Sequence, residues 1–88
     1  MTLHFPNASR SYDAMRRAVS FWGHDSAFEI AFHVEEDALR RLSPGVPDDE
    51  ASLLRSFDAN RARIEGVAGD TYSRSRRQNY HRLSASDF

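Results

Sequence analysis

The chain has 88 residues, no cysteine and a formal net charge of −1, so it is long enough for one small domain that neither disulfides nor thiolate chemistry stabilise. No stretch approaches the roughly 20 apolar residues of a membrane span, and the N-terminus lacks the apolar run of a signal peptide, so we expect a cytoplasmic protein without membrane association. All twelve basic residues are arginine, but a domain-wide basic excess, which would indicate nucleic-acid binding, is missing.

The N-terminal segment contains two short structural signals. Residues 3–5 alternate in polarity before a proline, a pattern typical of a brief edge strand. Residues 10–17 are polar except for Tyr12, and Asp13 is placed to cap a single turn over residues 13–16.

Residues 18–34 predict a central β-hairpin, because large apolar residues recur there with the period of two that half-buried strands require. Residues 23–26 supply the turn. A two- or four-residue connection would place Phe21 opposite Phe28, so that both strands bury their large side chains on one face. These inward residues are Val19, Phe21, Phe28, Ile30, Phe32 and Val34.

The other face of the hairpin combines small residues with one large aromatic side chain. Its members are Ala18, Ser20, Trp22, Ala27 and Ala31. Small residues let another backbone approach closely, and aromatic residues are enriched in interfaces. Two interpretations stay open: the N-terminal segment covers this face through Phe5 or Tyr12, or a second copy of the chain covers it.

Residues 35–42 predict a short helix, with acidic residues at its beginning, Arg40 and Arg41 at its end, and an ion pair between Glu36 and Arg40 at i,i+4 spacing. Its buried edge is Ala38, Leu39 and Leu42. A proline- and glycine-containing segment, residues 43–47, ends it.

Residues 48–73 predict a much longer helix, whose apolar stripe is Leu53, Leu54, Phe57, Ile64, Ala68 and Tyr72. Such a helix would measure ~39 Å, whereas a globule of this chain length has a diameter of roughly 30 Å. We therefore expect either a break near Gly66 and Gly69 or a projecting C-terminal part. Residues 80–83 predict a last strand that joins the hairpin.

Together these elements predict a single α+β domain over residues 1–88. A small antiparallel sheet built on the central hairpin is covered on one face by a short helix and a long helix. A core of this size is thin, since a domain of this length buries only about 60% of its chain's surface. We therefore expect a homo-oligomer, most simply a two-fold dimer.

Chemical motifs are absent from the sequence. The four histidines, His4, His24, His33 and His81, lack the spacing of a zinc site, and neither a nucleophile elbow nor a phosphate-binding glycine loop occurs. His33 draws attention because it shares the hairpin's outer face with Glu29. We predict no metal, no cofactor and no catalytic residues, and hence a non-enzymatic protein.

Arg61 falls inside the apolar stripe of the long helix, between Phe57 and Ile64. The interpretation we favour is that it pairs with Asp58 and Glu65 on its own helix. The alternative is a charged anchor at an interface.

The C-terminal segment offers the best binding candidate, because residues 71–88 carry a net charge of +3 whereas residues 35–70 carry −4 and residues 1–34 are neutral. Interleaved arginine and aromatic side chains can hold phosphates and stack on bases. The plainer interpretation is a solvated turn, or arginines paired with the acidic segment. With the two residues discussed above, the candidate partner-binding residues are Trp22, Arg61, Arg74, Arg76, Arg77, Tyr80, His81 and Arg82.

The order of these features resembles a known bacterial family. The runs LHFPNASRSYD, VSFWG, VEEDALRRLSP, FDANRARI and RSRRQNYHRLSASDF together are similar to the family of domain of unknown function 1488. The resemblance covers nearly the whole chain and implies a small α+β domain without an assigned biochemical role. The function we expect is a self-associating interaction or regulatory module with a possible protein partner, and the alternative is a nucleic-acid-binding module that uses the C-terminal arginines.

Overall fold

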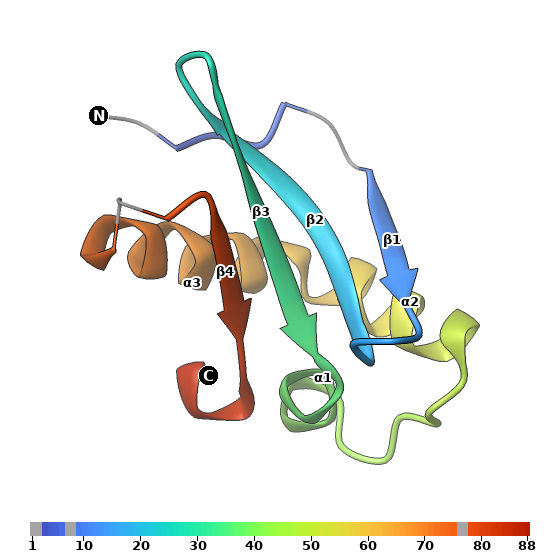
Figure 1. Ribbon diagram of the computed structural model, residues 1–88. Coiled ribbons are helices and arrows are strands. Elements are labelled where there is room, and N and C mark those ends of the chain that lie inside the picture. Colours follow the sequence, from blue (N-terminus) through green and yellow to red (C-terminus); the bar gives the residue numbers. More distant parts are fainter. Residues whose placement is uncertain (1–2, 7–8, 76–77) are drawn as a thin grey trace.

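The computed structural model describes residues 3–6, 9–75 and 78–88. Helices lie on one face of a four-stranded sheet, which confirms the predicted α+β class (Figure 1). In chain order the elements are β1 Arg10–Asp13, β2 Ala18–Asp25, β3 Phe28–Glu35, α1 Glu36–Leu42, α2 Glu50–Ala59, α3 Arg61–Arg74, β4 Tyr80–Leu83 and a 3₁₀ helix, Ala85–Asp87. The sheet therefore has one face turned toward the helices and one turned away from them.

The strands lie in the order β1-β2-β3-β4. The first three pair antiparallel, whereas β4 pairs parallel to β3. Parallel neighbours need a long crossover connection, and α1, α2 and α3 supply it. The predicted strand at residues 80–83 is confirmed, and β1 is a strand that the polar sequence of this segment did not predict.

The hairpin formed by β2 and β3 has a different register from the predicted one. Phe21 lies opposite Phe32, not opposite Phe28, and the turn is at residues 26 and 27. Gly23 belongs to β2, where an added Cβ would come within 2.9 Å of Cε1 of Phe5. The lack of a side chain at Gly23 therefore allows the N-terminal segment to approach β2 closely. The turn is at Ser26, whose φ is 56°.

The closed end of the hairpin extends beyond the core. Phe28 is 71% exposed, which contradicts its predicted place in the core, although Ile30, Phe32 and Val34 on the same strand are buried as predicted. A polar contact holds this end of the sheet, because the Tyr72 hydroxyl donates a 2.5 Å hydrogen bond to Oδ2 of the buried Asp25.

Aromatic rings form the centre of the core. Phe21 and Phe32 stack across β2 and β3 with ring centroids 5.3 Å apart, and the ring of Phe57 on α2 packs 5.1 Å from Phe21. Around them lie the other buried apolar residues: Val19, Ile30, Val34, Ala38, Leu39, Leu53, Ile64, Ala68, Tyr72 and Leu83. This set contains most of the apolar residues predicted to face inward from the hairpin and both helical segments.

The N-terminal segment packs on the helix side of the sheet. The backbones of His4 and His24 exchange two hydrogen bonds, of 3.0 and 2.8 Å, so the predicted edge strand is reduced to an isolated bridge. The ring of Phe5 lies 5.7 Å from that of Phe21, and Tyr12 also packs against the core. The interpretation that Phe5 or Tyr12 covers the other face of the hairpin is therefore wrong.

A bidentate ion pair attaches β1 to the helical layer. Nε and Nη2 of Arg10 each donate a 2.9 Å hydrogen bond to the carboxylate of Asp58 on α2. These bonds lower the pKa of Asp58 and raise that of Arg10. This contact explains how a strand of polar residues stays attached to the domain.

The long helical segment is broken at Asn60, whereas the sequence predicted either a break near Gly66 and Gly69 or a projecting C-terminal part. The side-chain amide of Asn60 donates to Oγ of Ser43 (3.1 Å) and to the backbone oxygen of Ser56 (2.9 Å). Because the segment is divided, α2 and α3 both fit within a molecule whose longest dimension is 37 Å. The short helix is confirmed as α1, in which Arg40 donates to Glu36 over 2.6 Å.

Two phenylalanines of β3 provide a matched test of the core. Phe32→Ala should lower the free energy of unfolding by about 3–5 kcal/mol, because it leaves a cavity among the stacked rings. Phe28→Ala removes the same side chain from an exposed position and should change it by less than about 0.5 kcal/mol. Urea unfolding measures both, with Phe32→Leu as a milder variant if Phe32→Ala does not fold. Equal losses for the two alanine variants would contradict the observed register.

Candidate functional site

The outer face of the sheet is the side turned away from the helices. Within the described ranges no helix or strand covers it (Figure 1). The strand registers place twelve residues on it: Ser11 and Asp13 from β1, Ala18, Ser20, Trp22 and His24 from β2, Glu29, Ala31, His33 and Glu35 from β3, and Tyr80 and Arg82 from β4. The predicted combination of small residues with Trp22 is therefore part of a larger face.

Neighbouring strands arrange these residues in rows. Ala31 has Trp22 as its partner on one side and Tyr80 on the other, so a small residue separates two large aromatic ones. In the next row His33 lies between Ser20 and Arg82. Large and small side chains therefore alternate in the row of Trp22, Ala31 and Tyr80, and a surface of complementary shape can pack against them.

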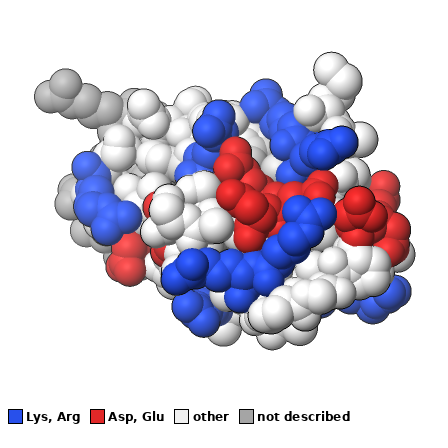
Figure 2. Space-filling model, turned by 90° about the horizontal axis from the view of Figure 1, so that it is seen from below, with Lys and Arg blue, Asp and Glu red and all other residues white. Residues whose placement is uncertain are grey.

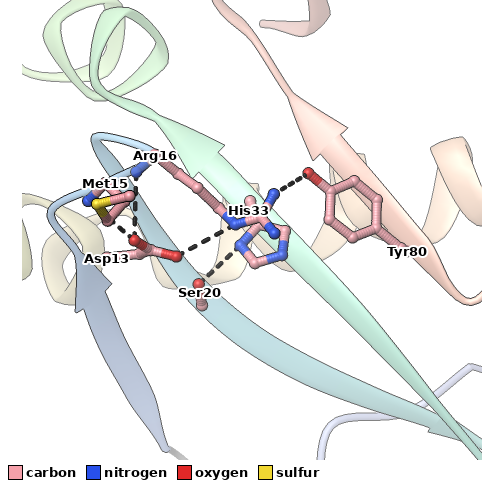
Figure 3. A network of polar contacts seen from close by, with 6 residues as sticks. All are labelled: Asp13, Met15, Arg16, Ser20, His33 and Tyr80. Carbon is pink, nitrogen blue, oxygen red and sulfur yellow. Dashed lines mark hydrogen bonds and ion pairs between the residues drawn. The ribbon is translucent and has the colours of Figure 1, made fainter.

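A polar network crosses the outer face (Figure 3). Oγ of Ser20 and Nδ1 of His33 are 2.7 Å apart, and the rings of His33 and Tyr80 lie 4.7 Å apart. Arg16, in the β1–β2 turn, reaches over from the far edge and donates a 2.8 Å hydrogen bond to the Tyr80 hydroxyl. Residues distant in sequence are therefore tied together above the sheet.

The β1–β2 turn holds Arg16 in this position. Oδ1 of Asp13 accepts hydrogen bonds from the backbone N–H groups of Met15 (3.0 Å) and Arg16 (3.2 Å), which confirms the predicted turn at residues 13–16. Oδ2 of Asp13 also lies 3.2 Å from Nε of Arg16. Both the backbone and the guanidinium of Arg16 are thus fixed by one carboxylate.

A shallow pocket of about 140 Å³ opens at this end of the outer face. Its lining consists of Arg16, Ala18, His33, Glu35, Tyr80 and Arg82. Nε of Arg82 lies 3.2 Å from the carboxylate of Glu35, so the pocket contains charges of both signs.

The environment of His33 disfavours the protonated imidazole. Partial burial lowers its pKa most, the nearby cation of Arg16 lowers it further, and Asp13 opposes this in part. The unfolded chain therefore binds more protons than the folded chain at pH values just below about 6.5. The contribution of His33 to the free energy of unfolding is therefore complete above about pH 6.5. It falls as the pH drops from there to the lowered pKa of His33 in the folded chain.

The structure separates the predicted C-terminal cluster. Tyr80 and Arg82 lie on the outer face, whereas His81 points the other way and is only 4% exposed, stacked 5.5 Å from the ring of Phe32. The prediction that His81 belongs to a binding surface is therefore wrong, because neighbours on a strand point to opposite faces.

The remaining predicted arginines lie elsewhere. Arg74 is an exposed residue in the last turn of α3, and residues 76 and 77 are outside the described part of the chain. Nε of Arg61 donates a 2.8 Å hydrogen bond to Glu65, and its guanidinium lies over the Phe57 ring. The favoured interpretation of Arg61, pairing along its own helix, is confirmed for Glu65.

Sequence reasoning missed Arg16 and Glu35 as site residues. Arg16 reaches the face because it follows β1, a strand that the sequence did not predict. Glu35 belongs to an acidic run that indicates the beginning of a helix. The alternation of β3 was a usable signal, since it places Glu35 on the same face as His33.

Across residues 3–6, 9–75 and 78–88, no group of three His, Cys, Asp or Glu side chains is arranged to bind a metal ion, and no helix is long and apolar enough to cross a membrane.

The pKa of His33 can be measured directly. We expect NMR titration of its ring to give a value below the ordinary histidine value of about 6.5. Arg16→Gln should raise it part of the way, because burial remains the larger cause. Arg63→Gln, on an exposed position of α3, is the matched control and should leave it unchanged. A value at or above the ordinary one would contradict the described environment.

Comparison with known proteins agrees with the resemblance seen in the sequence. The family model described as "Protein of unknown function (DUF1488)" matches residues 3–84, a range that contains all four strands and the three α-helices. Comparisons with curated proteins and with solved structures found no match. Since the match extends over nearly the whole chain, the chain belongs to the family of proteins of unknown function DUF1488.

Proposed function

We propose that this protein is a non-enzymatic interaction module that self-associates, two copies meeting through their outer sheet faces in a two-fold dimer. The observation that carries the proposal is the outer face itself, where Trp22 and Tyr80 flank the small Ala31 and no helix or strand of the described chain lies above them. Aromatic side chains beside small residues are typical of protein interfaces.

The size of the domain supports the same conclusion. A chain this short buries only about 60% of its surface on folding, and here a single layer of helices covers a single face of the sheet. The N-terminal segment, which was the other candidate to cover the outer face, packs against Phe21 on the helix side. A second copy is the simplest remaining cover for the outer face.

The charges of the face are compatible with its own copy. Asp13 pairs with Arg16, and Glu35 pairs with Arg82, so each face offers charges of both signs. Seen from below, which is not the outer face itself, acidic side chains gather in patches that arginine side chains border (Figure 2). Two such faces can exchange ion pairs across a two-fold axis without like-charge repulsion.

The contact between Ser20 and His33 does not favour catalysis. Ser20 is only 7% exposed, so its hydroxyl is a poor nucleophile for a substrate in solution. A catalytic histidine also needs a group that orients its second ring nitrogen. Among the described residues no carboxylate accepts a hydrogen bond from that nitrogen. These features support a structural role for the pair.

Light scattering tests the proposed dimer. At micromolar concentration we expect a particle of twice the 10.1 kDa of one chain. Ala31→Arg should weaken dimerisation at least about a hundredfold, because like charges juxtaposed in an interface cost several kcal/mol. Ala62→Arg, on an exposed position of α3, adds the same charge outside the face and should not change the mass. Circular dichroism verifies that both variants fold, and a monomer for the unmodified chain would contradict the proposal.

Nucleic-acid binding is the alternative function. It is favoured by one observation, that the aromatic rings of Trp22 and Tyr80 share an open sheet face with Arg82, since such rings can stack on bases. The pairing of Arg82 with Glu35 makes it less favourable.

A mobility-shift assay with single-stranded RNA and DNA separates the two functions. For a protein-docking face we expect no shift at physiological salt. A shift that weakens steeply with salt and is lost in the Arg82→Gln variant would support the alternative, because phosphate contacts release counterions. Arg63→Gln is the control for a non-specific loss of charge.

A further inference from the structure

The pocket on the outer face has the features of a ligand site. Its volume of about 140 Å³ exceeds the roughly 30 Å³ that one water molecule occupies in the liquid, so it has room for a group of several heavy atoms. It lies between the β1–β2 turn and the parallel pair of β3 and β4, so three separate segments of the chain build its walls.

Two guanidinium groups border this pocket. Arg16 is fixed through Nε by Asp13 and through Nη1 by the Tyr80 hydroxyl, so its position is set before any ligand arrives. Arg82 is held through Nε by Glu35. The hydrogen bonds of the described residues leave Nη2 of Arg16 and both terminal nitrogens of Arg82 available as donors. Guanidinium donors are suited to the oxygens of carboxylate and phosphate groups.

The imidazole of His33 adds a third group to the same wall. Ser20 engages Nδ1, while Nε2 has no hydrogen bond to any part of the described chain. The tilted ring of Tyr80, 4.7 Å away, forms the adjoining wall. Nε2 can therefore donate to a ligand oxygen when it carries a proton.

The hydrogen-bond donors of the lining favour an anion. Each arginine uses only part of its guanidinium on its own carboxylate, Arg16 on Asp13 and Arg82 on Glu35, so donors of both groups remain for a ligand. We propose that this pocket binds a small oxyanion, a carboxylate or phosphate group, held by the guanidinium groups of Arg16 and Arg82 beside His33. Glu35 limits the negative charge that the pocket accepts and competes with the ligand for the guanidinium of Arg82.

A bound oxyanion would change the electrostatics of His33. Arg16 disfavours the protonated imidazole in the empty pocket, and an anion between them would favour it. Binding should thus raise the pKa of His33, a response that a purely structural pocket would not give. The proposal does not rest on self-association, although both involve the outer face.

NMR titration of the full chain tests the proposal. Sodium phosphate and sodium acetate are added separately, with sodium chloride at matched ionic strength as the reference. We expect saturable shifts at His33 and Tyr80 and a higher His33 pKa with at least one of the two oxyanions, and the stronger of the two identifies the preferred oxygen group. Shifts that do not saturate, or that chloride reproduces, would overturn the proposal.

Three variants sharpen the test. Arg16→Gln should weaken binding about tenfold or more, because it removes a charged hydrogen-bond donor. Glu35→Gln should tighten binding, because it removes the opposing charge and releases Arg82. Arg63→Gln, on α3, loses the same charge outside the pocket and should bind as the unmodified chain does. Equal affinity in Arg16→Gln and Arg63→Gln would also overturn the proposal.

Light scattering on the same samples keeps the two proposals distinct. A chain that binds phosphate as a monomer would contradict the dimer and support the pocket. A chain that dimerises without saturable shifts would contradict the pocket and support the dimer.

Discussion

The stacking of Phe21 on Phe32, with Phe57 packed against them, is the contact on which the rest of the structure depends. It fixes the register between the two central strands and turns their apolar side chains toward the helices. Because side chains on a strand alternate between faces, the same contact places Ser20 and His33 on the opposite side, opposite one another. One register therefore determines both which residues form the core and which lie on the outer face. A slip of a single residue would exchange the two sets of side chains.

Alternation in the sequence was sufficient to predict which hairpin residues face inward, except Phe28, which lies beyond the core and is exposed. It did not predict which residues lie opposite one another. The observed register differs from the predicted one by an even number of residues, which leaves the two faces unchanged. The error came from Gly23, which indicates a turn in local sequence. Its real constraint is the ring of Phe5, which would clash with any side chain at that position, and a contact between segments so far apart is invisible in a local pattern. Ser26 carries the turn although serine gives a weaker signal for positive φ.

The remaining errors have the same origin, because long-range polar contacts override local preference. β1 has little strand character in its sequence, and the bonds from Arg10 to Asp58 attach it to the helices. The helix break is at Asn60, whose amide bonds to Ser43 across the preceding loop, although two glycines nearby are intrinsically poorer in a helix. For the candidate site, the sequence singled out Trp22, Tyr80 and Arg82, and the structure places them on one face of the sheet. The rest of the cluster follows only when the outward residues of neighbouring strands are considered together.

The outer face is already partly covered by its own side chains. Ala18 and Ser20 are almost excluded from solvent without a second layer above them, because Arg16, His33 and Tyr80 lie across the sheet and contact one another. A partner must therefore pack against this polar layer or displace it, and the guanidinium of Arg16 is the group that both a second copy and an oxyanion would engage. Since Asp13 and Tyr80 hold Arg16 in place whether or not a ligand is present, little conformational entropy remains to be lost when either one binds. The geometry of the turn at residues 13–16 is therefore as important to the outer face as the residues that lie on it.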